Sequence, residues 1–332
     1  MTRGKELLIA LSAAAAMLSG CAQMQPAAPG AAQTVKITPL GSHDGEFCPL
    51  DRALVFEDPD GTRILYDAGR TVRGPDDPRL GKIDAILVSH VHGDHLGDLI
   101  QPAANAGACA KPDFSVNVTP NSNSVNISLA KQAPVIVGGE MGSFLSAKVK
   151  GLGGDPGKLV RLVRFGAQTM VGKVMVASVP AVHSNGLPPA FLPPEQARLF
   201  DAAGLTAYVG PPGGFVLRFS NGLTAYLSGD TGITAEQDLV VRGHYKANMA
   251  VMNIGGFPFT TGPDEAAYVV NDLVRPKSVI ASHANEPATV GGKLAPNTRT
   301  AAFQKVAKMP VHVPISGRTM QFDGNGSCVS GC

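Results

Sequence analysis

Short apolar runs alternate along this chain with segments of helical character. Apolar, β-branched runs predict strands near residues 35–39, 53–56, 83–88, 135–137, 159–163, 174–182, 215–219, 223–229, 249–253 and 278–282. Helices are expected from Leu96 onward and near 141–150, 195–203, 235–242, 264–273 and 298–307, with Asp264 as a candidate N-cap. Interleaved strands and helices are the pattern of a layered α/β fold.

The largest group of candidate metal ligands follows the predicted strand 83–88. Segment 89–95 carries three imidazoles and one carboxylate. On extended backbone His90 and His92 point to the same side, whereas Asp94 and His95 lie beyond a glycine that permits a tight turn. Imidazole nitrogens with a carboxylate oxygen suit Zn²⁺, and to a lesser extent Mn²⁺ or Fe. One ion rarely takes four ligands from so short a segment. We therefore expect two neighbouring ions, each completed from elsewhere in the chain.

Three more ligand-type residues follow strand-like runs: His183, Asp230 and His283. Open α/β folds gather their chemistry at strand ends. Each residue alone also fits a capped loop or a turn, but their shared position favours a common site. His43, in a loop after the first predicted strand, is a candidate for substrate contact or a solvated loop residue. The histidines at 244 and 312 have no ligand-like context.

The order of these motifs resembles a known family. An HxHxDH element, a lone histidine, Gly-Asp-Thr-Gly and a final histidine are similar to the metallo-β-lactamase-fold hydrolase superfamily. Within it, the chain resembles the L-ascorbate-6-phosphate lactonase-like branch, on the motifs at 181–184, 227–232, 253–256 and 262–267. The resemblance covers about residues 35–322 and implies an α/β fold, a four-layer αβ/βα sandwich. Segment 185–213 is longer than the branch usually has there.

The resemblance also implies roles for individual residues. His90, His92 and His183 would bind one metal ion, and Asp94, His95 and His283 the second. Asp230 would bridge both ions, with a water or hydroxide between them, so Asp94 and Asp230 are the expected catalytic carboxylates. Asp67 matches an acid that steadies the ligand loop in the family, with a turn residue before Gly69 as the alternative.

Two divalent cations, Zn²⁺ first with Mn²⁺ or Fe as alternatives, generate a hydroxide nucleophile near neutral pH and polarise the oxygen under attack. The expected enzyme is a hydrolase of ester-type bonds, a lactone or phosphodiester first. The alternatives are a β-lactamase, or a non-catalytic envelope lipoprotein that binds metal or a ligand on the same fold. A redox iron enzyme on this fold ranks third.

Composition bounds the partners. Hydrophobic residues make up 44% of the chain and charged residues 16%, so a large core is available. The formal charge is +2, and no basic cluster indicates a nucleic-acid partner. A small-molecule substrate is the expected partner, and the oligomeric state stays open.

The first residues predict export. Arg3 and Lys5 precede the apolar stretch 7–18, which is too short to span a bilayer and is typical of a secretory signal. The sequence Leu-Ser-Gly-Cys ending at Cys21 resembles a bacterial lipobox. We therefore expect a signal peptide at 1–20, a lipid-modified Cys21 and an Ala/Pro/Gln-rich tether at 21–34. Ala22 favours the outer membrane facing the periplasm, and an ordinary cleaved signal is the alternative.

Four cysteines remain after Cys21: Cys48, Cys109, Cys328 and Cys332. An even count in an exported chain favours disulfides over free thiols or a further metal site. Three pairings are open, of which we favour Cys48–Cys109 and Cys328–Cys332. The expected organisation is thus a hydrolase domain at 35–322 and a C-terminal tail at 323–332 that carries the last cysteine pair.

Overall fold

The structure is a computed structural model that describes residue 1 and residues 33–332, so the expected signal peptide, Cys21 and most of the tether lie outside the described residues. Two mixed sheets dominate residues 33–332. The first has the order β10 (Val160–Leu162), β9 (Val135–Val137), β4 (Ala85–Leu87), β3 (Arg63–Tyr66), β2 (Leu54–Glu57), β1 (Val35–Pro39), β22 (Met320–Phe322) and β23 (Cys328–Ser330). The second has the order β11 (Gln168–Val171), β12 (Val174–Pro180), β15 (Gly213–Arg218), β16 (Thr224–Leu227), β17 (Met249–Asn253), β18 (Ser278–Ser282) and β21 (Val311–His312).

Helices and short ribbons connect these strands. The α-helices are α1 (Gly93–Leu96), α2 (Asn123–Lys131), α3 (Met141–Gly151), α4 (Pro156–Leu159), α5 (Pro194–Ala202), α6 (Pro263–Tyr268) and α7 (Arg299–Val306). A 3₁₀ turn, η1 (Pro189–Phe191), and two π-helical segments, η2 (Gln237–Arg242) and η3 (Val269–Val274), complete the helical elements of the described residues. The ribbons pair β5 (Leu99–Ile100) with β8 (Val116–Asn117), β6 (Gly107–Ala108) with β7 (Lys111–Pro112), β13 (Gly186–Leu187) with β14 (Ala207–Tyr208), and β19 (Thr289–Val290) with β20 (Lys293–Leu294).

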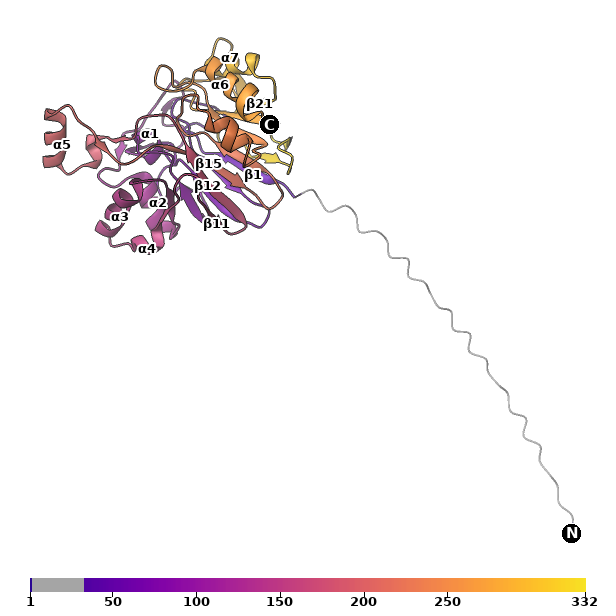
Figure 1. The fold of residues 1–332 in the computed structure, drawn as a ribbon, viewed down its shortest axis with the longest axis horizontal. Coiled ribbons are helices and arrows are strands. Elements are labelled where there is room, and N and C mark those ends of the chain that lie inside the picture. The colour runs from indigo at the N-terminus through magenta and orange to yellow at the C-terminus, as the bar shows by residue number, and fades with distance from the viewer. Residues whose placement is uncertain (2–32) are drawn as a thin grey trace. The chain divides into compact units, whose positions relative to one another are not determined.

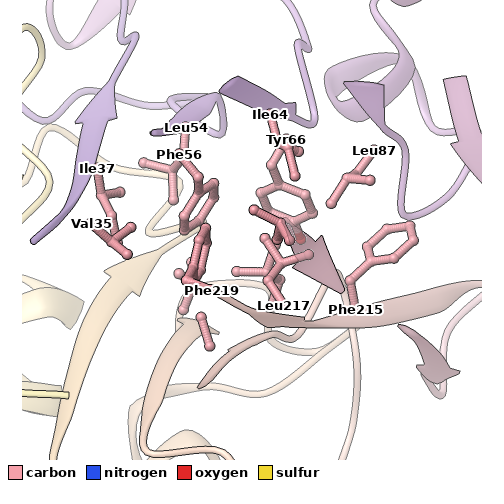
Figure 2. Packing of buried hydrophobic residues seen from close by; sticks show 14 of the residues in the cluster. Val35, Ile37, Leu54, Phe56, Ile64, Tyr66, Leu87, Phe215, Leu217 and Phe219 are labelled. Carbon is pink, nitrogen blue, oxygen red and sulfur yellow. The ribbon is translucent and has the colours of Figure 1, made fainter. Parts of the chain in front are cut away.

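The apolar faces of the two sheets pack against each other. Figure 2 shows Phe56 and Tyr66 of the first sheet meeting Phe215, Leu217 and Phe219 of the second. The rings of Phe56 and Phe219 stack with centroids 6.0 Å apart. Complete burial of a large apolar side chain stabilises a fold by roughly 1.5–3 kcal/mol, so this central layer holds the two sheets together.

The outer face of each sheet is covered by helices. Ile127 of α2 and Leu145 of α3 share a buried cluster with first-sheet residues such as Ile86. Ala266 of α6 and Phe303 of α7 share another with second-sheet strands. Figure 1 shows α2 and α3 on one side of the strands and α6 and α7 on the other. The predicted four-layer αβ/βα sandwich is therefore confirmed.

Three local predictions differ from the structure. The helix expected from Leu96 onward instead ends there, because Gly97 takes a left-handed conformation with φ +89°. Asp264 does not cap α6: Gly262 is the N-cap, and Pro263 occupies the first turn with its fixed φ. Helix α2 was not predicted, since its first turn is polar; the cap is the side chain of Ser122, which accepts from Val125 N.

Two features lie outside the layers. The long segment that contains α5 stands apart from the sandwich in Figure 1, and α5 has no buried residue. The tail after Phe322 adds β23 to the edge of the first sheet. Within residue 1 and residues 33–332, no helix is long and apolar enough to cross a membrane.

Candidate metal centre

The first group of ligand candidates follows β4. This strand is buried at every residue, so the chain leaves the core directly at the sheet edge. His92 has extended backbone just before α1, at φ −62° and ψ 145°, and Asp94 and His95 lie in the single turn of α1. Because Gly97 ends this helix at once, the turn presents both side chains close to the strand end.

The second group comes from the other sheet. His183 follows β12, Asp230 follows β16 and His283 follows β18. Strands β16, β17 and β18 are parallel, and β12 runs in the same direction because antiparallel β15 separates it from β16. The three carboxyl ends therefore meet at one edge of the second sheet.

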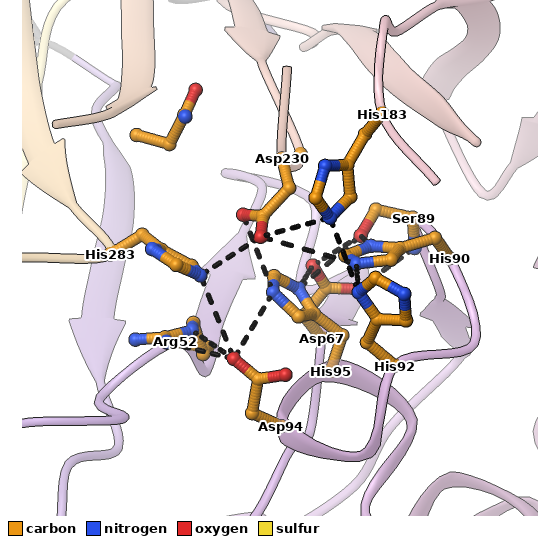
Figure 3. A network of polar contacts seen from close by, with 12 residues as sticks. Arg52, Asp67, Ser89, His90, His92, Asp94, His95, His183, Asp230 and His283 are labelled. Carbon is orange, nitrogen blue, oxygen red and sulfur yellow. Dashed lines mark hydrogen bonds and ion pairs between the residues drawn. The ribbon is translucent and has the colours of Figure 1, made fainter. Parts of the chain in front are cut away.

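Asp230 is the centre of the resulting cluster, as Figure 3 shows. One of its oxygens, Oδ2, lies 2.9 Å from Nε2 of His283, 3.8 Å from Nε2 of His183 and 4.0 Å from Nε2 of His90. The other, Oδ1, lies 3.4 Å from Nε2 of His95. A single carboxylate therefore reaches imidazoles that come from both sheets.

The ligand atoms form three overlapping groups, in each of which they lie within 4.8 Å of one another: His90, His92 and His183; His90, His95 and Asp230; and Asp94, His95 and His283. His92 Nδ1 lies 3.0 Å from His90 Nε2 and 3.2 Å from His183 Nε2. Asp94 Oδ2 lies 3.6 Å from Nε2 of both His95 and His283. Nitrogen ligands about 2.0–2.1 Å from a tetrahedral Zn²⁺ are about 3.4 Å from one another, so these spacings suit a cation inside each outer group.

Unpartnered atoms at the centre support the same fit. His95 Nε2, His283 Nε2 and Asp230 Oδ1 are buried and make no hydrogen bond of acceptable angle, although the two nitrogens lie 3.4 Å and 2.9 Å from the Asp230 carboxylate. Most buried side-chain polar atoms have one, because an unsatisfied buried group costs about 1–3 kcal/mol. Figure 3 shows these side chains turned toward one another. The residues present therefore fit divalent cations, and the role of each as a ligand stays a prediction.

Asp67 fixes the loop that carries His90 to His95 through hydrogen bonds. Its Oδ2 accepts hydrogen bonds from Ser89 Oγ and His95 Nδ1, both at 2.8 Å, and its Oδ1 accepts from Ser89 N at 2.8 Å. The side chain is fully buried. A carboxylate at Nδ1 keeps the proton on that atom and leaves Nε2 of His95 free to face the site. This is the position that the resemblance implied for Asp67.

Arg52 is a site residue that the sequence analysis missed. Its Nη2 donates to Asp94 Oδ2 at 2.8 Å and to Asn285 Oδ1 at 2.6 Å, and Nε also donates to Asp94. Asn285 in turn lies 3.2 Å from His283 Nδ1 through its side-chain nitrogen. The buried guanidinium thus orients both Asp94 and the loop that carries His283. Arg52 lies next to β2, far in sequence from every ligand motif, and no local pattern marks it.

Burial controls the protonation of one group of histidines. Loss of solvation is the main cause that lowers the pKa of His90, His92 and His183, and the pKa of His90 falls well below its usual range. Neutral imidazole is the form that binds a cation. This group therefore stands ready as a ligand set at neutral pH.

The acidic side of the cluster behaves differently. Burial opposes the protonation of His95, but the carboxylates of Asp230, Asp94 and Asp67 outweigh it and raise its pKa to about 10. Burial also works against charge on Asp94 and Asp230, yet electrostatic attraction and hydrogen bonds from neighbouring side chains, His95 and His283 for both and Arg52 for Asp94, bring both pKa values well below the usual range. A proton on His95 and a bound cation are alternative ways to balance these carboxylates, so uptake of a cation there would displace the proton.

The remaining histidines and cysteines lie elsewhere. His43 is neither a solvated loop residue nor part of the cavity at the cluster; it is buried, and its ring nitrogens lie 3.0 Å from Ser42 Oγ and from Gly107 O. His312 lies beside the sulfurs of Cys328 and Cys332, but these sulfurs are joined in a disulfide and offer no thiolate ligand. The structure pairs the cysteines as Cys48–Cys109 and Cys328–Cys332, the two pairings favoured from the sequence.

Comparisons with known proteins agree with this geometry. Residues 62–284 match the family model described as the beta-lactamase superfamily domain. A curated relative, a metal-dependent hydrolase from Cupriavidus necator, is 30% identical over 97% of this chain and 100% of its own length.

Solved structures share the fold. The metallo hydrolase Igni18 from the archaeon Ignicoccus hospitalis is 21% identical, with a TM-score of 0.56 over 87% of this chain and 99% of that one. The metallo-beta-lactamase fold protein YhfI from Bacillus subtilis is 13% identical, with a TM-score of 0.52 over 87% and 99% of the two chains. At these identities the likeness concerns the fold alone.

Proposed function

The chain belongs to the beta-lactamase superfamily and is a metal-dependent hydrolase, and we propose that it holds two divalent cations and cleaves an ester-type bond in a small molecule. The first candidates are lactones, followed by phosphodiesters, as in the lactonase-like branch that the motifs resemble. A β-lactam substrate ranks lower. Zn²⁺ is the proposed ion, with Mn²⁺ or Fe as alternatives.

One observation carries this proposal: the carboxylate of Asp230 lies between two groups of ligand atoms and reaches histidines of both. His90, His92 and His183 would hold one cation, and Asp94, His95 and His283 the other. Bound there, the cations would supply the positive charge that activates water and polarises the oxygen under attack.

The chain's own residues keep this cluster in shape. Asp67 fixes the tautomer and ring orientation of His95. Arg52 donates to the carboxylate of Asp94 and fixes its orientation. In hydrolysis of a lactone, the oxygen of water bonds to the carbonyl carbon and the ring C–O bond breaks. One proton of the water ends on the departing alkoxide and the other in solvent, which leaves a hydroxy carboxylate.

Metal analysis of purified variants tests the proposal. The native protein should contain two equivalents of cation and hydrolyse at least one member of a lactone, phosphodiester and β-lactam panel. His183→Ala should lose one equivalent, Asp94→Ala the other, and each should lose activity by at least 100-fold while remaining folded. His244→Ala, at an exposed histidine outside the cluster, is the matched control and should change neither.

Two results would contradict the proposal. Full activity in His183→Ala or Asp94→Ala would refute the ligand assignment. Two bound cations with no hydrolysis across the panel would instead favour the non-catalytic metal- or ligand-binding alternative.

We further propose that the protein is exported and anchored by lipid at Cys21, facing the periplasm from the outer membrane. The lipobox-like sequence supports this, as do four further cysteines that are paired, since disulfides persist in oxidising compartments. Cys21→Ser should move the protein from the membrane fraction to the soluble periplasmic fraction. Unchanged retention in the membrane fraction would overturn the anchor.

A further inference from the structure

The metal cluster opens into a cavity of about 360 Å³. Its lining consists of His92, Asp94, His183, Ser184, Asp230, Gly256, Phe259, Thr260, His283 and Asn285. None of these described lining residues is Lys or Arg. The guanidinium of Arg52 lies beside the cluster, but it is buried and bonded to Asp94 and Asn285. The cavity therefore offers no protein cation for a phosphate or carboxylate on the substrate.

One exposed apolar side chain lines the cavity, and two more lie on the segments that border it. Phe259 lines the cavity, yet 79% of its surface is exposed, and Phe257 on the same loop is 70% exposed. Val182, directly before His183, is 56% exposed. We call Phe257, Phe259 and Val182 the apolar rim.

Backbone hydrogen bonds hold the parts of this rim together. Gly232 N donates to Val182 O at 2.9 Å, and Thr261 N donates to Thr231 O at 3.1 Å. The loop that carries Asp230 is thus bonded on one side to the His183 segment and on the other to the loop of Phe259. The rim is built from the segment that carries His183 and from the loop of Phe259, and both are bonded to the loop that carries Asp230, so its position relative to the reacting centre is fixed.

Contiguous exposed apolar groups on soluble proteins commonly mark binding sites, and ligand pockets are mostly apolar with a few placed polar groups. The cavity is at the small end of the pocket range of about 300–1,000 Å³, so it suits a compact reacting group whose substituent extends over the rim.

We propose that the apolar rim binds an uncharged alkyl or aryl substituent of the substrate, so that the enzyme prefers neutral lactones or esters with an extended apolar group over anionic phosphodiesters. This inference rests on the proposed hydrolytic function and deepens it by assigning the substrate class. The occupant is the substrate itself: the rim joins the cavity through Phe259, and no Lys or Arg among the described lining residues would bind an anion.

A series of γ-lactones that differ only in the alkyl chain, from methyl to octyl, tests the preference. For the native protein, kcat/KM should rise about twofold per added methylene through a falling KM, about half of the effect on a log scale that complete burial of the methylene would give. Bis(p-nitrophenyl) phosphate should be a poorer substrate than the octyl lactone. Phe259→Ala should raise KM for the octyl lactone about 5- to 10-fold and change the methyl lactone less than twofold.

The control is Leu239→Ala, which removes a comparably exposed apolar side chain, 69% exposed against 79% for Phe259, on η2 and outside the cavity lining. It should leave the whole chain-length series unchanged. A flat series in the native protein, a preference for the phosphodiester, or equal effects of Phe259→Ala on the methyl and octyl lactones would overturn the inference.

Binding without turnover separates this inference from the proposed function. Calorimetric titration of the chelator-treated protein with the same lactones should show affinity that rises with chain length and falls in Phe259→Ala. If binding follows chain length but no lactone is hydrolysed, the apolar rim stands and the hydrolytic proposal fails. If affinity is independent of chain length, the inference about the rim fails whatever the activity.

Discussion

Replacement of Asp67 by Asn should weaken cation binding without removing any candidate ligand. The carboxylate accepts three hydrogen bonds, two from Ser89 and one from His95 Nδ1. An amide oxygen can keep the bond from Ser89 N, which turns the NH₂ group toward Ser89 Oγ and His95. Nδ1 would then have to accept, so the proton of a neutral His95 would move to Nε2, the atom that faces the site.

The size of the effect follows from that change of tautomer. Loss of an outer hydrogen bond to a metal-binding histidine commonly reduces metal affinity by about 10–100-fold, or about 1.4–2.7 kcal/mol. We expect this loss for the cation that His95, Asp94 and His283 would hold, and a smaller one for the other cation. The free energy of unfolding of the metal-free protein should also fall, by about 1–3 kcal/mol for the imperfectly paired donor.

Asp58 offers a matched control. It is equally buried, and it accepts from Ser220 N and Ser220 Oγ, each at 2.7 Å, and from Asp60 N at 3.0 Å. None of its partners is a candidate ligand. Asp58→Asn should therefore reduce stability by a similar amount and leave metal affinity unchanged.

Competition with a chromophoric chelator measures the Kd of each cation, and urea unfolding of chelator-treated protein measures stability. The reasoning fails if Asp67→Asn keeps its Kd within twofold of the native value. It fails equally if Asp58→Asn weakens metal binding as much as Asp67→Asn does.

Two further variants probe the supports of the site. Burial raises the pKa of Asp51 from 3.8 to about 6, although hydrogen bonds from Cys48 N and Ser42 N lower it. The folded protein therefore holds the Asp51 proton more tightly than the unfolded chain does. The resulting contribution to the free energy of unfolding is fully present below pH 3.8 and is lost as the pH rises through 6. That loss is about 3 kcal/mol. In urea unfolding of metal-free protein between pH 4 and pH 7.5, the unfolding free energy of Asp51→Asn should fall less than that of the native protein. An equal fall in both proteins would contradict the assignment. Gly69 has φ +53°, and a β-carbon there would lie 2.4 Å from Asp94 O, so Gly69→Ala should destabilise the protein by at least 1 kcal/mol and weaken cation binding, and an unchanged Kd and unfolding midpoint would refute that.

Much of this site could be predicted from local sequence, because its candidate ligands are concentrated at strand ends. Segment 89–95 follows a buried strand and contains four ligand-type residues, so both the strand and the chemistry are visible together. His183, Asp230 and His283 each follow a strand as well. Parallel strand direction then brings them to one edge, which is a property of the fold class rather than of any single residue.

Other parts left no local signal. Arg52 reaches Asp94 across 42 positions, and only the packing of β2 against its neighbours creates that contact. Helix α2 escaped prediction because its polar first turn resembles a loop. In the structure Asn123 is buried, and its Nδ2 donates to Gly69 O and Val72 O, so polar residues there satisfy backbone carbonyls of another segment.

The division of ligands between the two sheets has a consequence for when the protein acquires its ions. Four of the seven candidates follow β4 in the first sheet, and three follow strands of the second, so neither half of the chain contains the complete set. Hydrogen bonds from Gly213 N to Ser89 O and from Gly229 N to the hydroxyl of Tyr66 join the halves beside the cluster. A chain that has not yet folded therefore has no complete site for a cation. Metal loading would then wait for folding, and the metal supply of the compartment in which folding occurs would select the ion.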